Sequence, residues 1–185
     1  MNIAIYSGSF NPLHVGHLAI MERLSNDNAF DWTYLVVSPQ NPLKDASNKL
    51  TGADRYIAAV EAVKRHPELK VWVDDIELRL PPPQYSIHTL DVLKKREPAN
   101  VFTLVIGADN LDSIRRWKDY KRILCEYGVA VYPRSGFDLE QIMKSLKDEC
   151  ADYKIRILDA PIVDISSTRI REGMSEGEDM SEYLM

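Results

Sequence analysis

Residues 8–17 (GSFNPLHVGH) hold the densest group of side chains and backbone groups that can contact a phosphate. Gly8 permits a tight turn, and Gly16 leaves the first turn of a following helix open to a ligand. A helix N-terminus offers unpaired N–H groups and a partial positive charge, which favour phosphate. His14 and His17 can face the same side of that turn and donate hydrogen bonds to phosphate oxygens. The alternatives are two ordinary surface histidines beside a turn, and a metal site, although no Cys or acidic partner lies nearby in the sequence.

Residues 165–171 (ISSTRIR) form a second group with the same chemical preference. Small hydroxyl residues open a short helix after the last predicted strand, and arginines follow in its first turns. The hydroxyls of Ser167 and Thr168, together with helix N–H groups, can hold phosphate oxygens, and Arg171 adds directed donors with a delocalised charge. Plain N-capping by serine, with solvated arginines, is the alternative.

Gly107 and Asp109 directly follow the most apolar strand pattern, residues 101–106. In a parallel sheet this places them at the same edge as residues 8–17. The carboxylate can bind ribose hydroxyls or a metal. It can also cap the helix that follows.

Tryptophan and lysine residues elsewhere in the chain carry weaker signals. Trp117, in the basic stretch 115–118, can stack on a flat ring or pack in the core. Lys44 follows the second predicted strand, where an NAD-type site would carry an acid, and the first loop is not GxGxxG. The lysine in place of an acid and the missing GxGxxG loop both argue against a dehydrogenase. The alternative interpretation of Lys44 is an ordinary solvated charge on a loop. Trp32 and Trp72 are expected in the core.

Short β-branched runs alternate with helical patterns along the chain. Strands are predicted at residues 2–6, 32–38, 71–73, 101–106, 129–132 and 154–158. Helices are predicted at residues 15–24, 54–65, 86–96, 111–124, 138–149 and 166–172. The helix at 111–124 is expected to be broken near residues 117–119. This order predicts an α/β fold, a Rossmann-like doubly wound parallel sheet with helices on both faces. Ligands of such folds bind at the carboxyl ends of strands where the strand order reverses. We expect a single domain over residues 1–185, with 166–185 as a short C-terminal helical segment.

The composition limits the class of protein. The chain has 185 residues, 45% hydrophobic and 28% charged, with 23 Lys+Arg against 28 Asp+Glu. These values exclude a disordered class. A net charge of −5 disfavours nucleic acid as a partner, so an anionic ligand must be held by a few placed groups. No run of 18 apolar residues and no signal-peptide pattern occurs, and Cys125 and Cys150 fit a reducing compartment, so we expect a cytoplasmic protein that contacts no membrane.

The string GSFNPLHVGH resembles the GSFDPxHxGH signature of the HxGH nucleotidyltransferases, and ISSTRIR resembles their second signature, ISSTxIR. The intervening SPQNPLK, QYSIHTLDVL, IGADNLDSIRRWKDYKRIL and VAVYPRSG resemble further segments of the bacterial nicotinate-nucleotide adenylyltransferases of that superfamily. The resemblance covers residues 3–172. The departures from the family pattern are Ser7 for Gly, Asn11 for Asp, Gln84 for Ser, Ser86 for Thr, Ser135 for Pro, and a chain that stops where relatives continue into another helix.

The resemblance implies adenylyl transfer from ATP to nicotinate mononucleotide, which gives nicotinate adenine dinucleotide and pyrophosphate in NAD biosynthesis. It implies His14 and His17 as catalytic residues. The ATP-binding residues that it implies are Gly8, Ser9, Phe10, His14, His17, Gly107, Asp109, Ile165, Ser167, Thr168 and Arg171. The acceptor-binding residues that it implies are Lys44, Tyr85, Ser86, Trp117 and Arg134. Mg²⁺ is expected to ride mainly on the ATP phosphates without a protein metal site, and the protein to be a monomer or homo-oligomer.

Other functions stay open at this point. The acceptor can be nicotinamide mononucleotide or another substrate of the same superfamily. Phosphopantetheine adenylyltransferases share the fold but usually carry Thr at the position of His14. A non-catalytic nucleotide-binding or sensing protein is the alternative from another class, and it predicts ATP binding without turnover.

Overall fold

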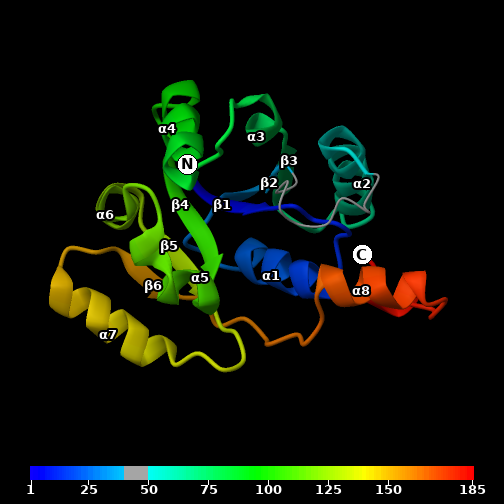
Figure 1. Ribbon diagram of the computed structural model, residues 1–185. Coiled ribbons are helices and arrows are strands. Elements are labelled where there is room, and N and C mark those ends of the chain that lie inside the picture. Colours follow the sequence, from blue (N-terminus) through cyan, green and yellow to red (C-terminus); the bar gives the residue numbers. More distant parts are fainter. Residues whose placement is uncertain (40–49) are drawn as a thin grey trace.

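The computed structural model describes residues 1–39 and 50–185, in which six parallel strands form one sheet. The strand order is β3-β2-β1-β4-β5-β6 (Figure 1). The strands are β1 (Asn2–Gly8), β2 (Trp32–Val37), β3 (Val71–Asp74), β4 (Val101–Gly107), β5 (Val129–Tyr132) and β6 (Ile155–Ile157). This order is that of a doubly wound α/β sheet, so the predicted fold class is confirmed.

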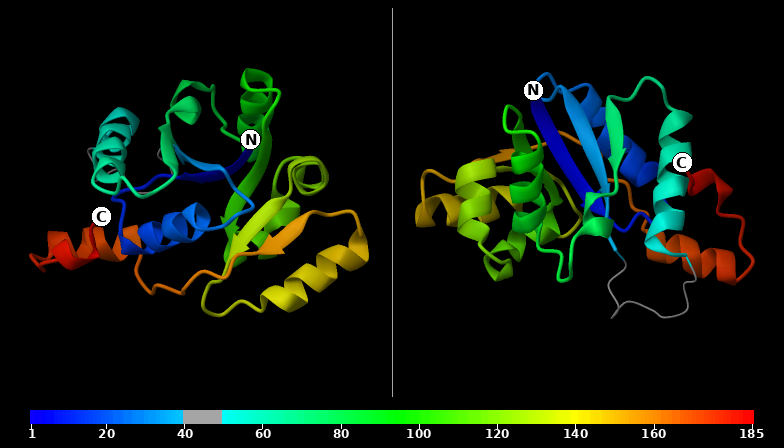
Figure 2. Two further views of the ribbon diagram at one scale, coloured as in Figure 1. Left: turned by 180° about the vertical axis from the view of Figure 1, so that it is seen from behind. Right: turned by 90° about the horizontal axis from the view of Figure 1, so that it is seen from above.

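Helices cover both faces of the sheet. The α-helices are α1 (Val15–Ser25), α2 (Gly52–Lys64), α3 (Ile76–Arg79), α4 (Ser86–Arg96), α5 (Ala108–Asp112), α6 (Tyr120–Arg122), α7 (Leu139–Glu149) and α8 (Ser167–Ser175). Two short 3₁₀ turns, η1 (Ile114–Arg116) and η3 (Ser181–Tyr183), and a π-helical turn, η2 (Ile123–Tyr127), complete the set in the described ranges. The view from above in Figure 2 shows α1 and α2 on one side of the strands and α4, α6 and α7 on the other.

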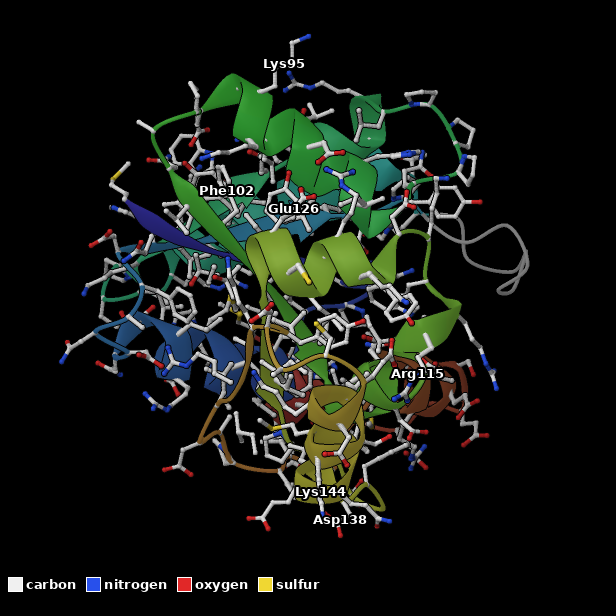
Figure 3. The ribbon with its side chains drawn as sticks, turned by 90° about the vertical axis from the view of Figure 1, so that its left-hand side faces the viewer. Lys95, Phe102, Arg115, Glu126, Asp138 and Lys144 are labelled. Atoms are coloured by element: carbon white, nitrogen blue, oxygen red, sulfur yellow. The ribbon has the colours of Figure 1, made fainter. Side chains whose placement is uncertain are left out.

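The two apolar cores follow from the alternation of side chains along buried strands. On β1, Ile3 and Ile5 belong to the core beneath α4 and α7, whereas Ala4 and Tyr6 belong to the core beneath α1 and α2. Both faces of a covered parallel strand are buried, so such strands read as continuous apolar runs. In Figure 3, Phe102 of β4 lies at the sheet, and Lys95 of α4 and Lys144 of α7 point away from it.

The strand order reverses between β1 and β4. β1 pairs with β2 on one side and with β4 on the other, and Tyr6 lies opposite Val105 in that second pairing. Gly8 and Gly107 therefore end neighbouring strands at one edge of the sheet. This edge is the expected ligand position in a doubly wound fold.

Two helix N-termini show a cap that is visible in the sequence. The Asp138 carboxylate accepts a hydrogen bond from Gln141 N–H and caps α7, and the Ser166 hydroxyl accepts one from Arg169 N–H and caps α8. The predicted helix over 111–124 is divided at Trp117, as expected. The pattern does not predict α3, since four residues are too few to show a helical period.

The expectation that Trp32 and Trp72 lie in the core is wrong. Their side chains are 42% and 60% exposed. α3, the helix after β3, packs against Val36 near the carboxyl end of β2. The amino-terminal half of this face, where Trp32 and Trp72 lie, stays open as a groove. No helix within residues 1–39 and 50–185 is long and apolar enough to cross a bilayer.

Thr33 offers a test of how the strands are packed. Its hydroxyl is buried in β2 and has no hydrogen-bond partner among the described residues. An unsatisfied buried hydroxyl costs about 1–3 kcal/mol, and valine has the same shape with a higher strand preference. We expect Thr33→Val to raise the free energy of unfolding by about 1 kcal/mol in urea denaturation. A loss of stability would show that the hydroxyl has a partner in solution.

Candidate active site

His14 and His17 cap the N-terminus of α1 reciprocally. His14 is the N-cap residue, and its Nδ1 accepts a hydrogen bond of 3.1 Å from Gly16 N–H. His17 Nδ1 in turn accepts one of 3.2 Å from the His14 N–H. The two ring centroids lie 3.7 Å apart. The prediction that these histidines face the same side of the turn is therefore confirmed.

This capping sets the chemical state of both rings. An imidazole nitrogen that accepts a hydrogen bond carries no proton, so each neutral ring holds its proton on Nε2. Burial, and to a smaller extent the Arg134 guanidinium, lower the pKa of His14 to about 4. Burial, His14 and Arg134 lower the pKa of His17 well below its usual range. Near pH 7 both rings are neutral, and each has one N–H donor not used by the helix.

Both rings line a cleft of about 160 Å³ at the carboxyl edge of the sheet. Arg134 follows β5 and enters the same cleft, and Ile165, Ser166 and Ser167 close it from the start of α8. The remaining lining residues are Tyr6, Gly16, Ile20, Tyr132, Pro133, Pro161, Ile162 and Val163. Imidazole, guanidinium and hydroxyl donors thus converge on one small volume, a set that suits phosphate oxygens.

α8 docks directly onto the loop that leads into α1, so the two motifs from opposite ends of the chain meet. The Ser167 hydroxyl donates to the Pro12 carbonyl at 3.0 Å. Arg171 Nη1 donates to the Asn11 carbonyl at 2.7 Å, and its Nη2 donates to Thr168 Oγ1 at 3.2 Å. Figures 1 and 2 show α8 beside the N-terminal end of α1. Within the described residues, Arg171 and Thr168 hold the loop rather than line the cleft.

The end of β1 is shaped by Phe10 rather than by Gly8. Phe10 adopts a left-handed backbone with φ of 45°, and its side chain is buried. A Cβ on Gly8 would lie 2.9 Å from the Phe10 ring, so position 8 needs glycine for space. Phe10 packs edge-on against the His17 ring at a centroid distance of 5.1 Å. The predicted tight turn exists, but its strained residue is Phe10.

The end of β4 presents Asp109 next to Arg134. Arg134 Nε lies 3.7 Å from Asp109 Oδ1, and that buried oxygen has no hydrogen-bond partner in the described part of the chain. A Cβ on Gly107 would lie 2.4 Å from the same oxygen, so only glycine leaves room for the carboxylate. The N-cap of α5 is Gly107, which makes the alternative role of Asp109 as the cap wrong.

Of the acceptor candidates, Arg134 lines the cleft, whereas Tyr85, Ser86 and Trp117 lie in a separate group. Tyr85 is the N-cap of α4, where Ser86 is the first helical residue, and the Lys118 ammonium lies 5.7 Å from the Tyr85 ring centroid. Lys118 follows Trp117, which is half-buried against the core. The structure thus brings the Trp117 segment near Tyr85, but neither lines the cleft. Lys44 lies outside the described residues.

Sequence reasoning did not find Tyr6, Tyr132 and Arg55. Tyr6 and Tyr132 line the cleft and meet edge-on, with centroids 6.1 Å apart, but in the sequence both read as ordinary strand residues. Arg55 is 1% exposed, and its Nη1 donates to the carbonyls of Ser9 and Ser38. A charged residue within a helical pattern is ordinarily expected to face solvent, so nothing in the sequence marks Arg55 as buried.

Comparison with known proteins assigns the family. Residues 5–173 match the model of the cytidylyltransferase-like family. A curated probable nicotinate-nucleotide adenylyltransferase of Flavobacterium johnsoniae is 38% identical over 184 residues, which span 100% of this chain and 92% of the relative. The chain belongs to the nicotinate-nucleotide adenylyltransferases. The same name is carried by a relative from Bacteroides fragilis, 37% identical over 97% of this chain and 85% of its own length.

Solved structures agree with this family at the level of the fold. A nicotinic acid mononucleotide adenylyltransferase of Plasmodium falciparum, complexed with NaAD, superposes with a TM-score of 0.79 at 20% identity over 99% of this chain and 90% of its own. A putative nicotinate-nucleotide adenylyltransferase of Vibrio parahaemolyticus gives 0.69 at 23% identity over 100% and 86%. The resemblance noted in the two sequence motifs is confirmed, and the chain is identified as a nucleotidyltransferase. The roles of individual residues stay predictions.

The capping role of His14 can be separated from its free N–H donor. His14→Ala removes both, and loss of an N-cap acceptor costs about 1 kcal/mol of stability. His14→Asn supplies a good capping oxygen but no imidazole N–H. We expect urea denaturation to show a loss of about 1 kcal/mol for the alanine variant and little for the asparagine variant, with turnover lost in both. Equal destabilisation by both variants would contradict the capping role.

Proposed function

We propose that this adenylyltransferase transfers AMP from ATP to nicotinate mononucleotide and releases pyrophosphate. The observation that carries the proposal is the cleft in which the Nε2–H donors of His14 and His17 meet Arg134 and the N-terminus of α8. That set of donors suits a polyphosphate, and the names of the curated relatives supply the acceptor.

The ATP phosphates would lie between α1 and α8. His14 and His17 donate through Nε2, with His17 nearest the transferring phosphorus. The backbone N–H groups in the first turn of α8, that of Ser167 among them, receive the β- and γ-phosphates, because the Ser167 hydroxyl already donates to the Pro12 carbonyl. Arg171 donates to the Asn11 carbonyl and to Thr168 Oγ1, and these bonds keep α8 against the loop beside the cleft. An anionic ligand raises the pKa of both imidazoles, because it stabilises their charged forms.

The adenosine end would lie over β1 and β4. The buried Asp109 Oδ1, which has no hydrogen-bond partner among the described residues, is an acceptor that a ribose hydroxyl can satisfy. Gly107 leaves the space that this contact needs. Gly8, Ser9 and Phe10 bring backbone close to the nucleotide at the end of β1. Ile165 closes the cleft from the other side.

The acceptor would reach the cleft from the Tyr85 side. Trp117 stacks on the pyridine ring, and the backbone at Tyr85 and Ser86 contacts its carboxylate. Lys44 steers the acceptor phosphate. Arg134, which lines the cleft beside the histidines, lies between the acceptor and the reacting phosphates.

The chemistry asks for positioning and charge stabilisation rather than for a base. The acceptor phosphate is already ionised at neutral pH, so it attacks the α-phosphorus in line and expels pyrophosphate without a prior proton transfer. Negative charge on the transferring group and the leaving pyrophosphate is stabilised by the imidazole N–H donors and by Arg134. Neutral imidazoles suit this role, because their Nε2 protons are fixed in place by the capping bonds.

The cleft does not form a protein cage for Mg²⁺. This hard cation prefers oxygen ligands, above all carboxylates, whereas the lining offers imidazole, guanidinium and hydroxyl groups. Among residues 1–39 and 50–185, no cluster of three His, Cys, Asp or Glu side chains could hold a metal ion. We therefore propose that Mg²⁺ enters on the ATP phosphates, and no step above depends on a protein ligand to it.

The proposed function is tested by measuring how fast the purified protein releases pyrophosphate from ATP in the presence of Mg²⁺. Nicotinate mononucleotide and nicotinamide mononucleotide are compared side by side, with phosphopantetheine as the control acceptor. Rapid release with the acid alone supports the proposal. Release with the amide instead assigns a different acceptor, and ATP binding without release from any acceptor supports a sensing protein.

His17→Ala removes the donor nearest the reacting phosphorus. Loss of one preorganised donor typically costs about 10²–10³ in turnover, so we expect a fall of several hundred-fold with a smaller change in ATP affinity. His17→Asn is the matched variant, because its side-chain oxygen can still accept from the His14 N–H. Steady-state kinetics measure the turnover of each variant, and titration with ATP measures its ATP affinity. Turnover close to that of the unmodified protein would remove His17 from the mechanism.

A further inference from the structure

Glu77 carries a buried carboxylate that the proposed reaction does not use. It lies on α3 and is 5% exposed. Its Oε1 accepts hydrogen bonds from the Ser7 hydroxyl at 3.1 Å and the Thr89 hydroxyl at 2.9 Å. Its Oε2 accepts one from the Ser38 hydroxyl at 2.5 Å. Three hydroxyl donors from three different segments thus meet on one side chain.

Within the described residues, this carboxylate is held without a cation. A buried charge is costly unless it is paired or well hydrogen-bonded, and Glu77 forms no ion pair among residues 1–39 and 50–185. The three hydroxyl donors compensate for part of that cost. Thr89 lies in the first turns of α4, where the partial positive charge of the helix N-terminus also favours a nearby anion.

The donors of this group connect the two ends of the proposed site. Ser7 precedes Gly8 at the end of β1, where the nucleotide is expected. Ser38 follows β2, and its carbonyl accepts from Arg55, whose Nη1 also donates to the carbonyl of Ser9. Thr89 lies one turn beyond Tyr85, and its N–H donates to the Tyr85 carbonyl at 3.2 Å.

From this geometry we infer that Glu77 is a positioning residue that fixes the start of α4, and with it Tyr85 and Ser86, relative to the end of β1. The inference rests on the proposed function in taking the start of α4 as the acceptor end. In-line transfer depends on the relative placement of two substrates, and a misplacement of about 1 Å can cost about 10²-fold in rate. Loss of the link through Thr89 should therefore affect the acceptor more than ATP.

Thr89→Val breaks this link with little change in shape. We expect kcat/KM for the acceptor to fall about tenfold or more, since only part of a misplacement of about 1 Å is needed for that loss. The KM for ATP should stay within about twofold, because the β1 and α8 contacts remain. Thr89→Ser restores the hydroxyl and should bring kcat/KM back to within about threefold of the unmodified protein.

Thr33→Val is the matched control. It makes the same chemical change at another buried threonine, whose hydroxyl has no partner in the described ranges and which lies near the opposite end of the sheet. Its kinetic constants should equal those of the unmodified protein. The inference would be overturned if Thr89→Val lowered kcat/KM equally for ATP and for the acceptor. It would also be overturned if this variant had a lower Tm but unchanged kinetic constants.

Hydrogen exchange tests the link independently of catalysis. The N–H groups of His88 and Thr89 both donate to the Tyr85 carbonyl, at 2.8 and 3.2 Å. In Thr89→Val these amides should exchange faster, whereas those of α1 should not. If the unmodified protein released no pyrophosphate, the proposed function would fail, and exchange would still decide whether Glu77 holds α4. Unchanged exchange at these amides would refute the link.

Discussion

The reciprocal hydrogen bonds between His14 and His17 are the interaction on which the candidate site depends. They begin α1, hold the two rings 3.7 Å apart and reserve each Nδ1 for the backbone. Residues from the other end of the chain bind the loop that leads into α1. Ser167 and Arg171 donate hydrogen bonds to the carbonyls of Pro12 and Asn11 in that loop. The start of α1 and the proposed phosphate contacts therefore share one turn, and the two side chains that cap the helix also line the cleft.

The doubly wound sheet brings the other parts to this turn. β1 and β4 end side by side, so Gly8 and Gly107 leave space at the same edge, one for a phenyl ring and the other for a carboxylate. The buried carboxylate of Glu77 extends this edge toward α4 through the hydroxyls of Ser7 and Thr89. A site divided between two substrates is thereby assembled from backbone ends whose separation is set by sheet hydrogen bonds.

Much of this arrangement can be predicted from the sequence, because its signals are local. Periodicity marks the six strands and the longer helices, and the caps at Asp138 and Ser166 are readable from residue type. The meeting of residues 8–17 with 165–171 follows from their shared edge. The exposure of Trp32 and Trp72 is not predictable in this way, since burial depends on which helix covers a strand and how far it reaches.

Residues that act through a distant partner are equally hidden. Arg55 reads as a solvated charge in a helical pattern, and Glu77 lies where no helix is predicted. Only the folded chain shows that each is buried against strand ends. Tyr6 reads as one more strand residue, and only the folded chain shows that it lines the cleft. Such side chains carry no pattern of their own, because their environment is made by other segments.

Because Trp32 and Trp72 are exposed, their fluorescence can be distinguished from that of Trp117. These two indoles lie in water near the amino-terminal half of the sheet, whereas Trp117 is half-buried near the start of α4. A collisional quencher dissolved in water reaches the exposed pair first and leaves the emission of the third. With phenylalanine at positions 32 and 72, a single intrinsic reporter would remain, and it would lie next to the segment where an acceptor ring is expected.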